Sequence, residues 1–172
     1  MQTTYESIDG RPALRFQRRI AHPVHAVWRA IAEADQVAKW FPTTVAGDLQ
    51  AGGHLTFTFE EHDLPPMQGD ITVFEPPRRL AFYWGEDHLD FELAPAEGGT
   101  QTDLRFTVLL DWEGKAARDG AGWHTCLDAL EKALDGGDER EIKAATGGWR
   151  EHYDEYVRRS FPATAGLPDG VG

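Results

Sequence analysis

The sequence predicts an α+β fold in which a curved antiparallel sheet wraps around a long C-terminal helix. Two observations predict it. Apolar and polar residues alternate in a series of short runs between Gly52 and Leu110, and apolar residues recur at helical spacing from Gly122 onward. A further strand and two short helices precede the alternating region. At 172 residues the chain has the usual length of one domain with a core of its own.

The N-terminal region predicts one strand followed by a pair of helices. Residues 13–21 alternate in polarity, and Pro23 ends the run in a position that is favourable at the first turn of a helix. We expect the first helix over residues 24–33. The second is short and ends at Pro42, because the proline ring cannot continue a helix.

Residues 52–110 predict a meander of strands. The loops between the runs are too short for a crossover helix, so neighbouring strands are expected to pair antiparallel. The apolar residues that define the strands are Leu55, Phe57, Phe59, Ile71, Val73, Leu80, Phe82, Trp84, Leu89, Phe91, Leu93, Leu104, Phe106, Val108 and Leu110.

The last strong helix carries one apolar stripe and stops at Gly136-Gly137. A weaker helix is expected over residues 149–160. We divide the chain into a core unit, residues 1–137, and a helical extension with a flexible tail, residues 138–172, both within a single domain. The extension could cover the mouth of a cavity, pack on the sheet or meet a second subunit. The stripe consists of Trp123, Leu127, Leu130 and Leu134.

The charge balance excludes two kinds of partner. The chain carries 17 Lys and Arg against 29 Asp and Glu, a net charge of −12 that repels nucleic-acid phosphates and anionic lipids. The single cysteine, Cys126, forms no internal disulfide, and no run of about 18 apolar residues predicts a membrane span. We therefore expect a cytoplasmic protein without nucleic-acid partners, and leave a homodimer open.

Four motifs follow one another in a fixed order. They are His22-Pro23-Val24-His25-Ala26-Val27-Trp28, Lys39-Trp40-Phe41-Pro42, the stretch from Gly69 to Trp84 with its Pro76-Pro77-Arg78-Arg79-Leu80, and the stretch from Gly122 to Leu130. Their order and spacing, over about residues 12–136, resemble the START-like superfamily, also called SRPBCC. Within it they are most similar to the branch of the activator of heat-shock-protein ATPase homologues.

The resemblance implies a helix-grip fold with an apolar cavity between the sheet and the long helix. Members of the superfamily range from carriers of hydrophobic ligands to aromatase/cyclases and co-chaperone domains, so the fold does not fix the function. Many members have a histidine in the last strand where this sequence has Phe106. Chemistry that depends on that histidine is not expected here.

Ten side chains are candidates for lining the cavity, because rings on the inner face of such a sheet offer large apolar contact areas. As a group they are equally compatible with the wall of a pocket and with a filled core. They are Trp40, Phe41, Phe57, Phe59, Phe82, Trp84, Phe91, Phe106, Trp123 and Leu127.

No catalytic, metal-binding or cofactor-binding set stands out. His22 and His25 have the spacing of two zinc ligands, but Pro23 starts a helix between them and no third ligand motif follows. His124 lies about 100° from Trp123 around the helix and off the apolar stripe. We therefore assign no catalytic residue, no metal and no cofactor.

These observations predict a protein that binds a small hydrophobic or amphipathic molecule in an internal cavity without catalysis. Two alternatives remain. One is a cavity enzyme of the cyclase, dehydratase or hydrolase kind, in which His124, Tyr83 or Asp128 transfers protons. The other is a chaperone-associated interaction module or stress-response protein, as the name of the resembling branch implies.

Overall fold

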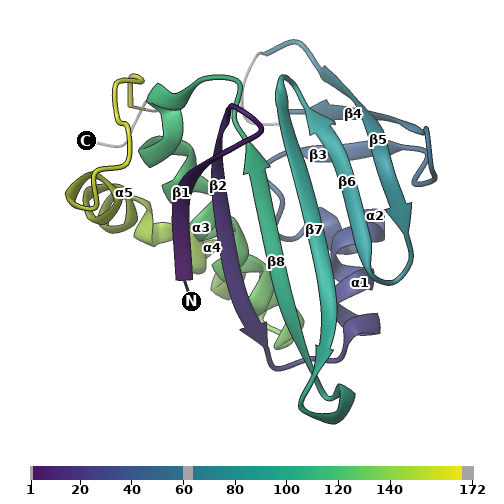
Figure 1. The fold of residues 1–172 in the computed structure, drawn as a ribbon. Helices are drawn as coiled ribbons and strands as arrows, with labels where there is room; N and C mark the ends of the chain where they lie inside the picture. Colours follow the sequence, from purple (N-terminus) through teal and green to yellow (C-terminus); the bar gives the residue numbers. More distant parts are fainter. Residues whose placement is uncertain (1, 60–63, 168–172) are drawn as a thin grey trace.

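The computed structural model describes residues 2–59 and 64–167, and eight strands within them form one sheet (Figure 1). The strands are β1 (Gln2–Ile8), β2 (Arg11–Ile20), β3 (Thr44–Gly47), β4 (His54–Thr58), β5 (Met67–Glu75), β6 (Arg79–Trp84), β7 (Asp87–Ala96) and β8 (Gln101–Leu109). Their order is β1-β2-β8-β7-β6-β5-β4-β3, with every pair antiparallel. The meander predicted from the short loops is therefore present from β4 to β8.

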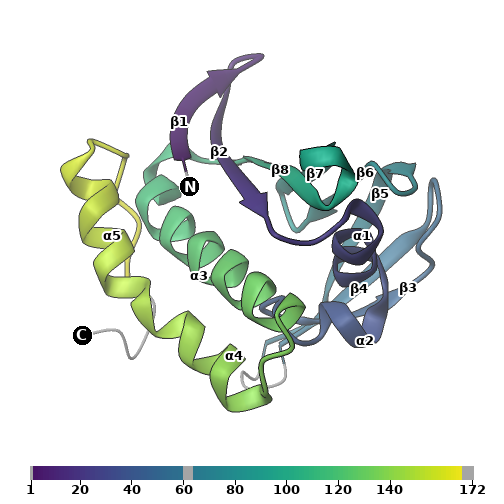
Figure 2. The same cartoon turned by 90° about the horizontal axis from the view of Figure 1, so that it is seen from below.

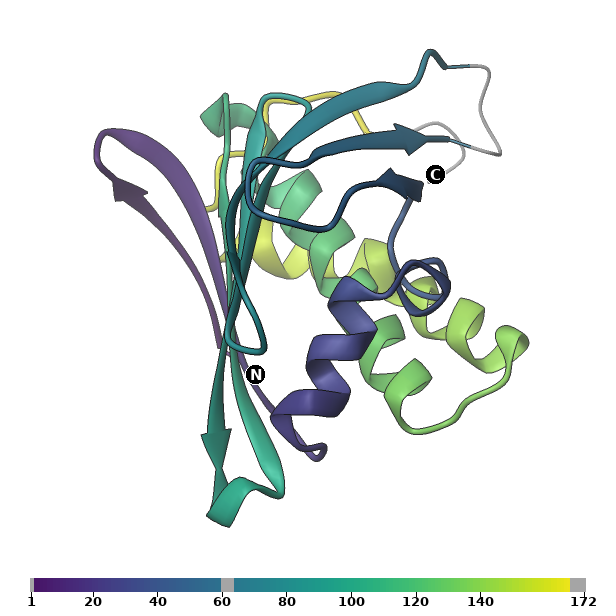
Figure 3. The same cartoon turned by 90° about the vertical axis from the view of Figure 1, so that its right-hand side faces the viewer.

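The α-helices lie on one side of this sheet (Figures 2 and 3). They are α1 (Val24–Ala32), α2 (Ala34–Val37), α3 (Ala116–Leu134), α4 (Glu139–Ala145) and α5 (Trp149–Arg158). The sheet bends so that β3, β4 and β5 reach over the helix layer, and α3 lies between the sheet and α5. None of the helices in the described ranges is both long enough and apolar enough to cross a membrane.

Alternation along the strands directs large apolar side chains toward α3. Phe91 of β7 and Phe106 of β8 are opposite each other in the sheet, and their ring centroids lie 4.2 Å apart. Leu127 and Leu130 of α3 are fully buried in the same core. The predicted apolar stripe of this helix therefore faces the sheet.

The sequence did not predict the two edge strands. β1 has the polar sequence QTTYESI and β3 has only four residues, so neither shows a run of alternating apolar side chains. β1 nevertheless pairs with β2 along its whole length, from Gln2 opposite Gln17 to Ile8 opposite Arg11. Backbone pairing with one neighbour holds each edge strand in place.

The C-terminal helices pack around α3. This helix begins at Ala116, before the glycine at which its strong periodicity starts. Close packing explains a small residue in this part: a Cβ on Gly120 would lie 3.2 Å from the ring of Tyr156 in α5. Asp138 and Glu141 form a capping box that starts α4. Tyr156 is 1% exposed, so α5 contributes to the same core as the sheet.

Candidate functional site

The ten predicted cavity residues fall into three groups. One group borders a small interior pocket and consists of Trp40, Phe41, Phe82 and Phe91. Another borders an open cleft and consists of Phe59, Trp84 and Trp123. The remaining three, Phe57, Phe106 and Leu127, are fully buried and border neither space. The fold joins the rings in one aromatic cluster but does not arrange them around one cavity.

The interior pocket, between α1, α2 and the inner face of the sheet, has a volume of about 60 Å³. Pockets that hold drug-sized ligands measure roughly 300–1,000 Å³, so this space is too small for such a ligand. Rings occupy the interior instead. The ring of Phe41 lies between 5.6 and 6.4 Å, centroid to centroid, from those of Phe57, Phe82, Trp84 and Trp123. The interior is therefore a filled core.

The open cleft has a volume of about 440 Å³, within the range of ligand pockets. It lies at one end of the sheet, where the start of β5 and the β6–β7 turn face the N-terminal half of α3. Its apolar wall consists of Pro42, Phe59, Met67, Trp84, Trp123, Cys126 and Trp149. Its charged border consists of Glu86, Asp87, Asp111, Lys115, Arg118 and Asp119.

Tryptophans dominate the apolar wall. The rings of Trp84 and Trp123 meet edge to face with centroids 5.3 Å apart. Trp149, at the start of α5, stacks on Tyr153 at 5.1 Å and completes the wall from the other side of α3. The indole Nε1 of Trp84 is buried and has no hydrogen-bond partner in the part of the chain that the structure describes. Burying such a donor without an acceptor costs about 1–3 kcal/mol.

Lys115 is the central group of the charged border. Its Nζ lies 2.6 Å from Asp111, 2.8 Å from Asp87 and 3.7 Å from Asp119. Burial lowers the pKa of Lys115, but its hydrogen bonds to Asp111 and Asp87 and the nearby negative charges outweigh this and raise the pKa. Lys115 therefore stays charged.

Asp87 is the buried partner of this lysine. Its side chain is 2% exposed, and burial raises the pKa of its carboxyl group. Two donors act in the opposite direction, Lys115 Nζ at 2.8 Å and the backbone N–H of Asp111 at 2.9 Å. The pair thus anchors the start of β7 to the start of α3 beside the cleft.

The border of the cleft carries more negative than positive charge. Four carboxylates stand against two cations, and both cations are engaged, because Arg118 Nε donates to Asp119 at 2.7 Å. The cleft therefore has a negative potential above an aromatic wall.

The thiol of Cys126 lies in the wall of the cleft without the properties of a nucleophile. The residue is 9% exposed, and burial raises the pKa of the thiol to about 12. A protonated thiol is a poor nucleophile and a poor metal ligand. Cys126 therefore contributes apolar contact.

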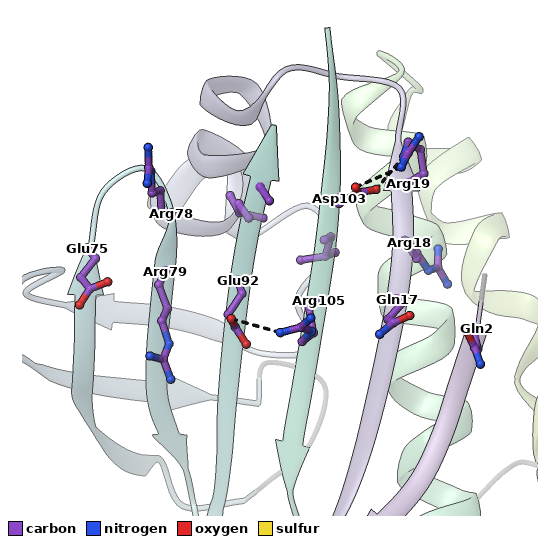
Figure 4. A pocket seen from close by; sticks show the side chains of 13 residues that line it. Gln2, Gln17, Arg18, Arg19, Glu75, Arg78, Arg79, Glu92, Asp103 and Arg105 are labelled. Carbon is purple, nitrogen blue, oxygen red and sulfur yellow. Dashed lines mark hydrogen bonds and ion pairs between the residues drawn. The ribbon is translucent and has the colours of Figure 1, made fainter. Parts of the chain in front are cut away.

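A broader depression, of about 1010 Å³, lies on the outer face of the sheet (Figure 4). Its charged groups pair across neighbouring strands: Arg19 Nε donates to Asp103 at 2.6 Å, and Arg105 lies 3.5 Å from Glu92. Paired charges of this kind are typical of the solvated face of a sheet. This face therefore does not compete with the cleft as a ligand site.

Of the three groups considered for proton transfer, His124 and Asp128 lie 4.0 Å apart, Tyr83 lies away from both, and none of the three borders the cleft. His124 faces α5, where its Nδ1 lies 2.7 Å from the hydroxyl of Tyr156, and it does not border the cleft. Tyr83 is 38% exposed and contacts His88. Asp128 forms a salt bridge with Arg18, in which Oδ1 of the aspartate lies 2.7 Å from a guanidinium nitrogen of the arginine. In the described residues no cavity brings these three together.

Of the residues that border the cleft, sequence reasoning named only Phe59, Trp84 and Trp123 as site residues, and it missed the others, Met67, Lys115 and Trp149 among them. Met67 lies in β5 before the first recognised apolar residue of that strand, and Lys115 lies in the connection to α3. Trp149 was assigned to the C-terminal extension, for which the sequence left three positions possible: over the cavity mouth, on the sheet or against a second subunit. The structure places Trp149 at the cleft, and the aromatic stripe that it begins was the available signal.

Comparisons with known proteins bear on family and fold. The family model described as "Activator of Hsp90 ATPase homolog 1-like protein" matches residues 21–135. CalU16 from Micromonospora echinospora is 24% identical with a TM-score of 0.68, over 91% of this chain and 94% of that one. The conserved protein of unknown function EF2215 from Enterococcus faecalis is 20% identical with a TM-score of 0.69, over 92% of this chain and 91% of that one.

A third solved structure is the protein encoded by gene BPP1335 from Bordetella parapertussis. It is 27% identical with a TM-score of 0.63, over 87% of this chain and 88% of that one. No curated protein matches the chain. The family match and these likenesses confirm the predicted helix-grip fold of the SRPBCC type.

Proposed function

The chain belongs to the family of activator of Hsp90 ATPase homolog 1-like proteins, and from this membership and the geometry of the cleft we propose that it binds a small hydrophobic or amphipathic molecule. The binding site is the cleft beside α3. The apolar part of the ligand lies against the indoles of Trp84, Trp123 and Trp149, and its polar end lies at the charged border.

One observation carries this proposal. The cleft has a ligand-sized volume of about 440 Å³, and three tryptophans line it without filling it, whereas the interior pocket measures about 60 Å³. Rigid indole rings give large contact areas at a low cost in conformational entropy.

The charged border supports a restriction on the polar end of the ligand. Its four carboxylates and two cations leave a negative balance, and Lys115 is already shared among three carboxylates. A neutral or cationic group therefore fits the border better than a carboxylate or phosphate.

Native mass spectrometry of freshly purified protein is the first test. A tightly held ligand adds mass to the native spectrum and not to the denatured one. Titration with Nile red, a neutral apolar fluorophore, then measures the affinity of the empty site.

Two tryptophan variants locate the site. Trp149→Ala removes a ring from the wall and is expected to weaken Nile red binding at least about tenfold. Trp112→Ala is the matched control, because Trp112 is 49% exposed and does not border the cleft. Equal losses in the two variants, or no bound probe in the wild type, would refute the cleft as the binding site.

A further inference from the structure

Away from the cleft, α3 and α5 bring together two imidazoles and a carboxylate. His124 and Asp128 are one turn apart on α3, and His152 comes from α5, which runs beside α3 (Figure 2). His152 Nε2 lies 3.4 Å from Asp128 Oδ2, and His124 Nε2 lies 4.0 Å from Asp128 Oδ1. One ligand atom from each of the three lies within 4.8 Å of the others.

This spacing is close to that of a chelating set. Nitrogen and oxygen ligands bind Zn²⁺ at about 2.0–2.1 Å in tetrahedral geometry, which places neighbouring ligand atoms about 3.3–3.5 Å apart. The contact between His152 and Asp128 already has this length. The two imidazole rings are stacked with centroids 3.5 Å apart, so the His152 ring must turn out of this stack before both rings direct a nitrogen lone pair at one ion.

The hydrogen bonds around His124 define which of its nitrogens is free. The hydroxyl of Tyr156 donates to Thr3 Oγ1 at 3.2 Å, so its oxygen accepts from Nδ1–H of His124 at 2.7 Å. The lone pair then resides on Nε2, on the side of Asp128. Two acceptors face each other there, an arrangement that a cation between them would stabilise.

The hydrogen bonds that other residues make to His124 and Asp128 also match those that metal ligands usually have. Histidines that bind metals donate their second ring N–H to a partner, and ligating carboxylates are held by further hydrogen bonds. Tyr156 supplies the first of these contacts, and Arg18 supplies the second by donating to Asp128 Oδ1 at 2.7 Å. The charge of Arg18 is shared with Glu131, also at 2.7 Å, so the carboxylate of Asp128 is not fully neutralised.

Exposure leaves the cluster accessible to an ion. The side chains of His124, His152 and Asp128 are 14%, 21% and 33% exposed. The ligands are thus held by their surroundings while one side meets water, which could complete the coordination shell.

We propose that His124, Asp128 and His152 form a binding site for a divalent transition-metal ion, in the first place Zn²⁺, that links α5 to α3. Two imidazoles and one carboxylate suit Zn²⁺ better than Ca²⁺ or Mg²⁺, which prefer oxygen ligands. The sequence did not predict a metal, because its third ligand lies on a different helix from the other two.

Metal titration of the full chain tests the proposal. After treatment with EDTA and removal of the chelator, calorimetry with Zn²⁺ is expected to give one site per chain, and Co²⁺ is expected to give visible d–d absorption. His152→Gln should weaken Zn²⁺ binding at least about tenfold. His54→Gln is the matched control, because His54 and Asp70 form an exposed imidazole–carboxylate pair at 2.5 Å that has no third ligand among the described residues.

A measurement without mutation keeps the test independent of folding. In the wild type, paramagnetic Co²⁺ should shift the imidazole resonances of His124 and His152 and leave those of His54 in place. The absence of stoichiometric binding, equal affinity in the wild type and His152→Gln, or Co²⁺ shifts confined to other histidines would each overturn the proposal.

Discussion

The guanidinium of Arg18 in β2 lies 2.7 Å from the carboxylate of Asp128 in α3. The arginine side chain is only 5% exposed and also bonds to Glu131 at 2.7 Å and to the backbone carbonyl of His124 at 3.1 Å. An arginine therefore occupies a core-facing position of the strand, between Phe16 and Ile20, and it connects the sheet to the long helix by charge.

This pairing predicts that removing the carboxylates lowers the free energy of unfolding more than removing the arginine does. The double variant Asp128→Ala/Glu131→Ala leaves a buried guanidinium without its carboxylates and should lose about 3–5 kcal/mol of unfolding free energy. Arg18→Met leaves two carboxylates that reach water and should lose less than about 2 kcal/mol. Urea unfolding in EDTA measures both. Arg19→Met, at an exposed pair with Asp103, is the control and should leave the free energy of unfolding nearly unchanged.

The negative border of the cleft predicts that a ligand with a cationic head group binds more tightly than one with an anionic head group. Decylamine and decanoate have chains of equal length and opposite charge, so their competition with Nile red isolates the effect of the head group. Decylamine should displace the probe at a roughly 3- to 10-fold lower concentration, since one favourable charge contact near a surface is worth about 1 kcal/mol. Stronger competition by decanoate would contradict the proposed orientation of the ligand.

The environment of Lys115 predicts a loss of stability in alkali. Its pKa is raised in the folded state, so the folded state binds the proton more tightly than the unfolded chain does. The stabilisation is complete below the ordinary value of 10.5 and is lost as the pH rises through the folded pKa. The free energy of unfolding should therefore fall above about pH 10.5.

The double variant Asp87→Asn/Lys115→Met removes both charges of this pair and leaves neither buried alone. It should show a shallower alkaline loss than the wild type. Burial also raises the pKa of Tyr156, which acts in the same direction in both proteins, so the difference between them reports Lys115. Identical alkaline slopes would show that Lys115 is not responsible.

Burial of Cys126 predicts a slow thiol reaction. Its pKa of about 12, against an ordinary value of 9.0, lowers the thiolate fraction about a thousandfold at neutral pH. Labelling with a disulfide reagent at pH 7.5 should be at least that much slower in the folded protein than in guanidinium chloride. Comparable rates would mean that the wall of the cleft opens readily around this residue.

The C-terminal helices predict that residues 1–137 do not fold stably alone. Ile142, Tyr156 and Phe161 all belong to the core, and each large side chain of this kind contributes about 2–5 kcal/mol. Their joint removal approaches the whole stability of a typical domain. A chain ending at Gly137 should lose its cooperative thermal transition and its near-ultraviolet circular dichroism.

The full chain carrying Tyr156→Ala is the milder companion to this truncation. It should stay folded and lose about 3–5 kcal/mol, because the ring is 1% exposed. A truncated chain with the thermal midpoint of the whole protein would show that residues 138–172 form a separate unit.

Periodicity was sufficient to predict the strands of the meander and the stripe of α3, because each of these elements buries one regular face of its own sequence. It was insufficient for β1, whose position depends on pairing with β2 and on contacts of Thr3 with α5, 153 residues away along the chain. It was also insufficient for Arg18, since its carboxylate partners lie more than 100 residues further on.

The candidate site was predictable in its residue types and not in its shape. The sequence singled out Phe41, Phe91, Trp84 and Trp123 alike as cavity residues. Whether a ring fills a core or borders a cleft depends on packing within a few ångströms, and alternation along a strand carries no such information. The rings that pack against one another in the interior fill the space there, whereas the rings near the end of the sheet leave the cleft open.

The contact between Thr3 and Tyr156 also sets an order of events during synthesis. The backbone carbonyl of Thr3 accepts from Arg159, and its hydroxyl accepts from Tyr156, so the first strand and the last helix are fastened to each other. At ribosomal rates of about 5–20 residues per second, the 153 residues that follow Thr3, up to and including Tyr156, take roughly 8–30 s to emerge. For that time Thr3 has neither of these two donors, so the nascent hairpin of β1 and β2 cannot reach its final packing until α5 has emerged.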